Sequence, residues 1–215
     1  MSKIYPTYNL EKEKHKQDFD CVVGVDECGR GSLFGNVVAA VVYIPPRNVK
    51  NLLDKVHDSK QLSAKKRDEL AVLIKENCKY GIGEIGPDVI DDINILRATE
   101  QAMAMALSQL FLNHNINYDC ILIDGTVKLP MVSEYQEQVI KGDAKILSIA
   151  AASIIAKTYR DNKILSSPNK DYYNLWDISS NKGYGTKRHR EGIKTYGLSK
   201  KHRKTFGICR QYVGK

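Results

Sequence analysis

Short apolar runs rich in β-branched residues limit most strongly how this chain can fold. Residues 21–25 (CVVGV) and 36–44 (NVVAAVVYI) are shorter than most helices, and Pro45-Pro46 closes the second run. Runs of this kind are typical of buried strands. Residues 80–85 predict a third strand, and the apolar residues 120–123 predict a further buried strand.

Helical periodicity separates these predicted strands. Ser63 is placed to cap a helix that ends near Asn77, and Asp88 or Asp91 is placed to cap a longer helix that ends near Asn113. Apolar residues at helical spacing predict the buried face of the longer helix. These residues are Leu96, Met103, Ala106, Leu107 and Leu110.

The second half of the chain predicts two more helices. Residues 144–159 are dense in small residues and good helix formers, which favours close packing on a sheet. Residues 187–196 predict a basic helix, whereas residues 166–182 resemble a loop. Because strands alternate with helices along the chain, we expect an α/β fold. The first 18 residues are polar and weakly patterned, which predicts a loosely attached arm.

Composition narrows the class of protein. A length of 215 residues suits one domain with a small extension. No apolar stretch approaches the length of a membrane span, and the first residues do not form the apolar core of a signal peptide, so we expect a cytoplasmic protein. The five cysteines are far apart and form no Cys-x-x-Cys pair, which predicts reduced thiols rather than disulfides or a zinc site.

The net charge of +8 comes from one segment. Residues 182–204 contain nine lysines and arginines and a single acid, Glu191, while the rest of the chain is formally neutral. Clustered bases of this kind indicate binding to a polyphosphate backbone, although a solubilising surface would have the same composition. His189 and His202 lie in this segment, and we expect them to belong to the basic surface.

Two predicted strands end in acids. Asp26 and Glu27 follow the first apolar run, Asp124 follows the run at 120–123, and Asp143 directly precedes the alanine-rich helix. Functional groups of α/β sheets gather beyond the carboxyl ends of parallel strands, so these carboxylates converge if the two strands are parallel neighbours. Crowded carboxylates repel one another unless a proton or a cation intervenes, and ligand sets made only of oxygen favour Mg²⁺ or Mn²⁺.

Each acid alone also has a structural interpretation. An aspartate at a strand end is often a turn former, and one before a helix is often a cap. The sequence contains no Gly-x-Ser-x-Gly, no phosphate-binding Gly-x-x-x-x-Gly-Lys and no His-Glu-x-x-His motif. The residues alone therefore indicate a metal-dependent nuclease without choosing its substrate.

Six ordered segments resemble the ribonuclease HII family, the type 2 ribonucleases H. They are GVDECGRGSLFG at 24–35, DSKQLSAKKRDEL at 58–70, IDDINILRATEQAM at 90–103, ILIDG at 121–125, VIKGDAKILSIAAASIIAKTYRD at 139–161 and KGYGTKRH at 182–189. The resemblance spans nearly the whole chain. It implies a mixed five-stranded sheet flanked by helices with a C-terminal helical extension. We therefore expect an arm at residues 1–18, a catalytic core at 19–165 and a basic substrate-binding extension at 166–215.

The resemblance also implies roles for particular residues. The catalytic acids that bind metal would be Asp26, Glu27, Asp124 and Asp143. Residues that bind substrate would be Gly29, Arg30 and Gly31 at the ribose 2′-hydroxyl, Tyr184 against the neighbouring sugar, and Lys60, Lys187 and Arg188 at the backbone. Glycines allow a close approach of the main chain, and the 2′-hydroxyl is the group that distinguishes RNA from DNA.

Several positions depart from the usual family pattern. Cys28 stands where alanine is common, Ser32 and Asn36 stand where prolines are frequent, and Gly185 replaces the proline after the tyrosine. Residues 126–128 likewise replace a segment that more typically contains asparagine. None of these is a proposed metal ligand. They raise the question of how the first loop is kept rigid.

The implied reaction is hydrolysis with two Mg²⁺ or Mn²⁺ ions, roughly 4 Å apart, that bridge the scissile phosphate. The substrates would be RNA/DNA hybrids and DNA duplexes with embedded ribonucleotides, cut on the 5′ side of the ribonucleotide to leave 5′-phosphate and 3′-hydroxyl ends. We expect a monomer without an obligate protein partner. The alternatives are a DNA nuclease of related fold, such as a resolvase, and a basic nucleic-acid-binding protein without catalysis.

Overall fold

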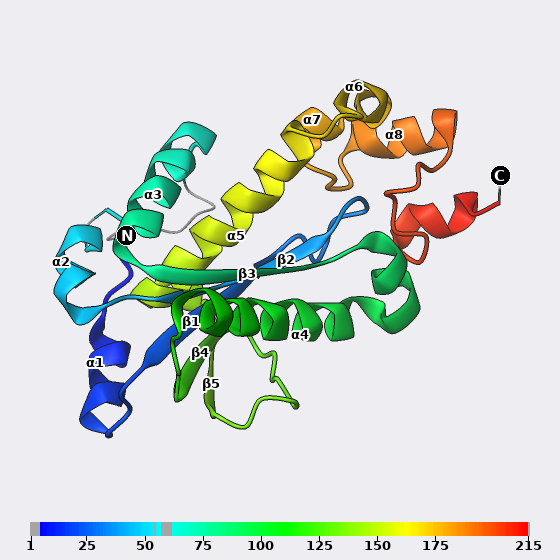
Figure 1. Ribbon diagram of the computed structural model, residues 1–215. Coiled ribbons are helices and arrows are strands. Elements are labelled where there is room, and N and C mark those ends of the chain that lie inside the picture. Colours follow the sequence, from blue (N-terminus) through cyan, green and yellow to red (C-terminus); the bar gives the residue numbers. More distant parts are fainter. Residues whose placement is uncertain (1–4, 54, 57–61, 215) are drawn as a thin grey trace.

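A five-stranded mixed sheet lies at the centre of the computed structural model, which describes residues 5–53, 55–56 and 62–214 (Figure 1). The strand order is β3-β2-β1-β4-β5. Strand β2 is antiparallel to β1 and β3, whereas β1, β4 and β5 are parallel. The strands are β1 (Val22–Cys28), β2 (Val37–Tyr43), β3 (Lys79–Ile85), β4 (Cys120–Asp124) and β5 (Tyr135–Val139). The predicted α/β fold with a mixed five-stranded sheet is confirmed.

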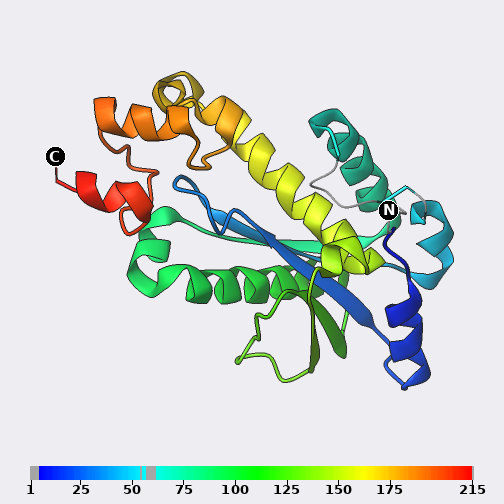
Figure 2. The ribbon, with the colours of Figure 1, turned by 180° about the vertical axis from the view of Figure 1, so that it is seen from behind.

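Helices cover both faces of this sheet. Helices α3 (Ala64–Asn77) and α5 (Leu147–Leu165) lie on one face, and α4 (Pro87–His114) lies on the other (Figures 1 and 2). Alternate side chains of β2 point to the two layers: Val38, Ala40 and Val42 pack with α5, whereas Val37, Ala39 and Val41 pack with α4. Burial on both faces explains why the strand sequences are continuously apolar.

Glycines allow two helices to approach the sheet closely. A Cβ atom at Gly24 of β1 would lie 2.4 Å from the backbone of Ser148 in α5. On the other face, Cβ atoms at Gly81 and Gly83 of β3 would lie 2.1 and 2.0 Å from carbonyl oxygens of α4. The separation between the sheet and these helices therefore depends on the missing side chains.

Helix α3 begins as predicted, because the Ser63 side chain accepts a hydrogen bond from Lys66 N. The predicted caps of α4 are wrong: its N-cap is Gly86, and Asp91 instead accepts hydrogen bonds from the C-terminal segment at Lys204 N and Thr205 N. None of the helices in the described part of the chain combines the length and the apolar character that a membrane crossing requires.

A kink at Asn94 divides α4. Asn94 has φ 69°, and its side chain accepts hydrogen bonds from Leu96 N and Arg97 N, as a helix cap does. Leu96 lies in the first turn after this kink and is 46% exposed, so its predicted place in the core is wrong. Met103, Ala106, Leu107 and Leu110 are buried as predicted.

The C-terminal residues form a small helical layer beyond the end of α5 and beside the β1–β2 loop (Figure 2). Phe34 of this loop packs with Trp176, Ile178 and Ile193 in a separate apolar cluster. The predicted helix at 187–196 is confirmed, whereas the loop expected at 166–182 contains short helices. The elements are α6 (Lys170–Tyr173), η4 (Asn174–Trp176), α7 (Ile178–Asn181), α8 (Lys187–Tyr196) and η5 (Gly207–Tyr212).

The described part of the N-terminal arm is packed against the core, so its expected loose attachment is wrong. Thr7 exchanges backbone hydrogen bonds with Lys145 and Leu147. In α1 (Asn9–Lys16), Glu11 is fully buried and accepts a hydrogen bond from Ser148 N. The polar sequence of the arm suggested exposure, but the buried Glu11 side chain accepts a hydrogen bond from the first turn of α5. Two short elements follow β2, η1 (Pro46–Asn48) and α2 (Val49–Leu52).

Candidate active site

Three aspartates converge at one edge of the sheet. Asp26 lies in β1 and Asp124 ends β4, and these strands are parallel neighbours with Val25 opposite Ile123. Asp143 lies in η3 (Gly142–Ala144), just before α5. One carboxylate oxygen from each aspartate lies within 4.8 Å of the others. The convergence that the strand-end pattern predicted is confirmed.

Backbone contacts hold the cluster together. Asp124 Oδ1 accepts a hydrogen bond of 2.7 Å from Gly142 N, which joins the end of β4 to the turn before α5. A Cβ atom at Gly142 would lie 2.6 Å from Ile149 Cδ1, so glycine permits this approach. Asp26 Oδ1 accepts a hydrogen bond of 2.7 Å from Glu27 N. The carboxylates are thus positioned by main-chain geometry.

Burial and mutual repulsion disfavour negative charge in this cluster. Burial raises the pKa of Asp26 well above its usual value, and the neighbouring charges of Glu27 and Asp124 raise it further. Asp26 and Asp143 are both buried, so water compensates them poorly. A divalent cation would relieve the repulsion, and the all-oxygen donor set fits a hard ion such as Mg²⁺ or Mn²⁺.

Glu27 lies beside the three aspartates without belonging to their group. Its Oε1 accepts a hydrogen bond of 3.2 Å from Arg30 Nη1, and its buried Oε2 has no hydrogen-bond partner among the described residues. Burial raises the pKa of Glu27, Arg30 lowers it, and Asp124 raises it. The charge of Glu27 therefore interacts with the acidic cluster, and its side chain bonds directly to Arg30 of the next loop. Its role as a ligand stays a prediction.

The two glycines of the Gly29-Arg30-Gly31 turn differ in what they contribute to the fold. Gly29 has φ 92°, and a Cβ atom there would lie 2.4 Å from Arg160 Nε, so the structure requires glycine. At Gly31, φ is not positive and a Cβ atom would meet nothing within 4 Å. The fold therefore does not explain glycine at position 31, whereas a ligand that approaches the main chain would.

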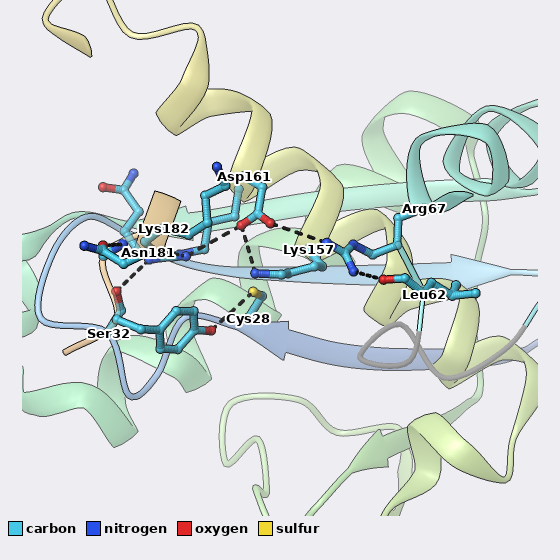
Figure 3. A network of polar contacts seen from close by, with 12 residues as sticks. Cys28, Ser32, Leu62, Arg67, Lys157, Asp161, Asn181 and Lys182 are labelled. Carbon is cyan, nitrogen blue, oxygen red and sulfur yellow. Dashed lines mark hydrogen bonds and ion pairs between the residues drawn. The ribbon is translucent and has the colours of Figure 1, made fainter. Parts of the chain in front are cut away.

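Tyr184 stands beside this turn although it comes from the C-terminal layer. Its hydroxyl lies 4.0 Å from Cys28 Sγ at the end of β1 (Figure 3). The cationic groups of Lys157 and Arg160 lie 5.4 and 5.5 Å from the centre of its ring. Burial raises the pKa of Tyr184 to about 12, so its hydroxyl stays protonated at neutral pH. The structure thus brings the predicted tyrosine to the predicted turn.

The structure gives less support to the residues that were predicted to bind the nucleic-acid backbone. Lys187 and Arg188 lie exposed in the first turn of α8, and the nearest acid to Lys187 Nζ is Glu191 at 4.0 Å. Lys60 lies outside the described residues. The structure places neither Lys187 nor Arg188 in contact with the acidic cluster, and their roles stay predictions.

The expectation that His189 and His202 belong to the basic surface is wrong. Both are buried, and their Nε2 atoms lie 3.1 Å apart. Ser199 N donates to His202 Nδ1, which leaves the proton of His202 on Nε2. His202 Nε2–H then donates to His189 Nε2, and His189 Nδ1–H donates to the carbonyl of Tyr184. A chain of neutral imidazoles therefore supports the tyrosine loop.

This histidine pair predicts that the folded state loses stability in mild acid. Burial, together with the neighbouring His189, lowers the pKa of His202 to about 3, whereas the unfolded chain takes up the proton near pH 6.5. The unfolded state binds more protons between these values, so stability is complete above pH 6.5 and falls as the pH decreases. From pH 7.5 to 5.5 we expect a loss of about 1.4 kcal/mol attributable to His202.

Urea unfolding followed by the fluorescence of Trp176, the single tryptophan, measures this loss, because its ring centroid lies 5.2 Å from that of His202. The comparison is with His202→Gln, since the buried acids Glu11, Asp26 and Glu27, whose pKa values are raised, change stability in the opposite direction in both proteins. Equal pH dependence in the two proteins would contradict the prediction.

Sequence reasoning missed two buried cations. Arg160 of α5 and Arg203 of the C-terminal segment are 2% and 0% exposed, and their guanidinium groups donate to main-chain oxygens of the β1–β2 loop. Arg203 was expected on a surface that faces phosphates. A basic run gives no sign that one of its members points inward, and only the three-dimensional contacts reveal it.

A mixed sheet with three aspartates that converge beside its parallel strands β1 and β4 is typical of a metal-dependent phosphodiester hydrolase with a ribonuclease H-like fold. The sequence model of the ribonuclease HII family matches residues 23–209. The ribonuclease HII of Trichodesmium erythraeum is 44% identical over 190 residues, which cover 86% of each chain. That of Pelagibacter ubique is 47% identical over 189 residues, which cover 86% of this chain and 95% of the relative.

Solved structures agree with the sequence relatives. Ribonuclease H2 of Pyrococcus horikoshii superposes with a TM-score of 0.72 at 28% identity, covering 89% of this chain and 96% of the other. The chain belongs to the ribonuclease HII family. It is a hydrolase that cleaves the RNA of RNA/DNA hybrids and cuts at ribonucleotides embedded in DNA.

Proposed function

We propose that Asp26, Glu27, Asp124 and Asp143 bind two divalent cations, Mg²⁺ or Mn²⁺, and that hydrolysis occurs on the 5′ side of a ribonucleotide. The observation that supports this proposal is the approach of three aspartate oxygens to within 4.8 Å of one another. Bound metal supplies a water of lowered pKa and neutralises charge on the leaving 3′-oxygen. The products would have 5′-phosphate and 3′-hydroxyl ends.

The acids in this proposal position charge and do not need to act as bases. Asp124 is oriented by Gly142 N, and Asp26 is oriented by Glu27 N. Glu27 links the acids to Arg30, whose side chain is 43% exposed. Contact of Arg30 with the ribose and the charge of Glu27 would therefore be coupled through the ion pair between these two residues.

The proposed ribose site consists of Gly29, Arg30, Gly31 and Tyr184. The main chain at Gly31 is open to close approach, and Tyr184 offers an aromatic face for the neighbouring sugar. Hydrogen bonds from the main chain to the 2′-hydroxyl would discriminate ribose from deoxyribose, because deoxyribose cannot make them. Lys60, Lys187 and Arg188 are proposed to contact the backbone phosphates, which position a duplex without reading its sequence.

Alanine at position 31 tests the ribose site. Gly31→Ala adds a methyl group into open space, so we expect a change in unfolding free energy below about 0.5 kcal/mol. The same methyl group would separate the main chain from the sugar, and we expect kcat/KM on a duplex with one ribonucleotide to fall by roughly tenfold to a hundredfold. Unchanged kcat/KM with unchanged stability would contradict the assignment.

Three matched duplexes test the whole proposal. One contains a single ribonucleotide, one is all DNA, and one is a continuous RNA/DNA hybrid, each incubated with the protein and Mg²⁺ or Mn²⁺. We expect a cut 5′ of the ribonucleotide, cleavage of the hybrid and an intact DNA duplex. A cut on the 3′ side, or products with 3′-phosphate ends, would contradict the proposed reaction.

The division of labour along the chain is also a proposal. Residues 19–165 would form the catalytic core, and residues 166–215, which include Tyr184 and the basic segment, would bind the duplex. Affinity should then fall steeply with salt as bound counterions are released. The cysteines of the described residues are free thiols, which suits the reducing cytoplasm. We propose a cytoplasmic monomer that needs no protein partner, although the solved RNase HII of Archaeoglobus fulgidus is in a complex with PCNA.

A further inference from the structure

The loop between β1 and β2, residues 29–36, is held by two buried guanidinium groups. Arg160 Nε donates to the carbonyl of Asn36 at 3.0 Å, and Arg160 Nη2 donates to Ser32 Oγ at 2.8 Å and to the carbonyl of Phe34 at 3.1 Å. Arg203 Nε donates to the carbonyl of Gly35 at 2.9 Å, and Arg203 Nη1 donates to the carbonyl of Arg30 at 3.0 Å. Five acceptors of one short loop are thus bound to two side chains.

The same contacts tie this loop to the tyrosine segment. Arg160 Nη1 donates to the carbonyl of Lys182 at 2.9 Å, two residues before Tyr184 (Figure 3 shows Ser32, Asn181 and Lys182). Leu33 N donates to the carbonyl of Gly183, and Arg203 N donates to the carbonyl of Leu33. The position of Tyr184 relative to the Gly29–Gly31 turn therefore depends on Arg160 and Arg203.

A neighbouring set of ion pairs surrounds Asp161, the residue that follows Arg160 in α5. Asp161 accepts from Lys157 Nζ at 2.9 Å and lies 3.9 Å from both Arg67 and Arg160 (Figure 3). Arg67 in turn donates to the carbonyl of Leu62. The contact of Arg160 with Asp161 is long, so most of its donors are directed at the loop.

These two cations are costly to bury. Arg203 forms no ion pair with any described residue, and its Nη2 has no hydrogen-bond partner there. Burial and the charge of Arg160 together lower the pKa of Arg203 to about 9. A cation buried without a close carboxylate among the described residues, as Arg203 is, opposes folding, and the like charge of Arg160 adds to the cost. Stabilisation of the fold alone therefore explains the arrangement poorly.

The geometry of the guanidinium supplies the better explanation. Its planar fork can donate to several acceptors at fixed angles, which a lysine ammonium on a flexible chain does not reproduce. The loop contains no proline, so its backbone has little stiffness of its own. Acceptors spaced along the loop and held by two rigid forks compensate for this missing stiffness.

We propose that Arg160 and Arg203 are positioning residues that set the discrimination for an isolated ribonucleotide, by holding the Gly29–Gly31 turn in register with Tyr184. This inference rests on the proposed ribose site. An embedded ribonucleotide offers one 2′-hydroxyl in one register, so the turn must be placed accurately. A continuous hybrid offers a ribose in every register, and a displaced turn still meets one.

The test compares Arg203→Lys and Arg160→Lys with the parent protein. We expect kcat/KM on the duplex with one ribonucleotide to fall roughly tenfold to a hundredfold, as small displacements near a reacting group do, whereas kcat/KM on the hybrid falls less than about threefold. Amide hydrogen exchange of residues 30–36 should accelerate. Arg97→Lys is the matched control, because the Arg97 side chain is 60% exposed and, among the described residues, forms an ion pair only with Glu100 of its own helix. This variant should change neither the ratio of kcat/KM on the two substrates nor the amide hydrogen exchange of residues 30–36.

A structural role alone would lower the melting temperature and reduce both activities by the same factor, which would overturn the inference. Ser32→Ala provides a milder variant if the arginine variants do not fold, since it removes one acceptor of Arg160 and leaves both cations in place. It should lower the ratio of kcat/KM on the single-ribonucleotide duplex to kcat/KM on the hybrid about threefold, with a smaller decrease in melting temperature than the arginine variants show. An unchanged ratio in Ser32→Ala, with the arginine variants unfolded, would likewise overturn it.

The outcome at Gly31 separates this inference from the proposed ribose site. If Gly31→Ala lowers cleavage at the single ribonucleotide and the arginine variants keep the parent ratio, the positioning inference fails and the ribose site stands. If Gly31→Ala leaves cleavage unchanged, the ribose site itself fails, and the inference that depends on it fails with it.

Discussion

Replacement of Asp124 by asparagine is expected to lower kcat by about 10³-fold or more, because loss of a metal-binding carboxylate removes several kcal/mol of transition-state stabilisation. Asparagine keeps an Oδ1 atom that can accept the hydrogen bond from Gly142 N, so the turn before α5 should persist. Duplex binding should change little. Single-turnover cleavage of the duplex with one ribonucleotide measures the loss, and fluorescence anisotropy measures binding.

The metal-free stability of this variant gives an independent check. Asp124 raises the pKa of both Asp26 and Glu27, so its neutral replacement relieves repulsion. We therefore expect the melting temperature without metal to stay constant or rise, and calorimetric binding of Mn²⁺ to weaken. Asp143→Asn should behave alike in cleavage, whereas Asp92→Asn, at an exposed acid of α4, should behave like the parent. Full activity in both Asp124→Asn and Asp143→Asn would end the assignment of these acids.

A single methyl group at Gly83 is expected to destabilise the protein strongly. The added Cβ atom would lie 2.0 Å from the carbonyl oxygen of Ala102 and 2.7 Å from Ala106 N, both in the backbone of α4. A backbone cannot rotate away as a side chain can, so α4 must move from the sheet and open the core beneath it. We expect Gly83→Ala to lower the unfolding free energy by about 3 kcal/mol, near the upper range for overpacking.

Thermal unfolding measures this effect, and for a chain of this size it corresponds to a decrease of roughly 6–12 °C in melting temperature. Gly31→Ala is the matched control, because the same substitution there meets nothing within 4 Å. Equal melting temperatures for the two variants would show that the contact between β3 and α4 tolerates displacement.

Most of the sheet could be predicted from the sequence, because β1, β2 and β4 are buried on both faces and are therefore rich in apolar residues. Strand β5 was missed for the complementary reason. Its sequence, YQEQV, lies at the edge of the sheet, where polar side chains remain in solvent, and no apolar run marks it. Leu96 was misplaced because it belongs to the first turn after the cap at Asn94, and helical spacing does not reveal where a helix begins.

The acidic cluster could be predicted for a different reason, namely that strand ends are visible in the sequence and parallel neighbours bring them together. The residues that hold the ribose loop could not. Arg160 and Arg203 look like surface cations in a chain with 33 lysines and arginines, and His189 and His202 look like members of a basic run. Their burial depends on contacts between segments more than a hundred residues apart, such as that from Arg203 to Arg30.

The dependence of the β1–β2 loop on Arg203 affects the order in which the enzyme becomes competent during its synthesis. Asp26, Asp124 and Asp143 are translated by residue 143, and the sheet and α5 that hold them are translated by residue 165. Domains can fold as they leave the ribosome, at about 5–20 residues per second. A nascent chain that ends before Arg203 would therefore have its acids in place while the proposed ribose-reading turn lacks one of the two arginines that hold it. The residues proposed to cleave would be complete before the residues proposed to select the cut site.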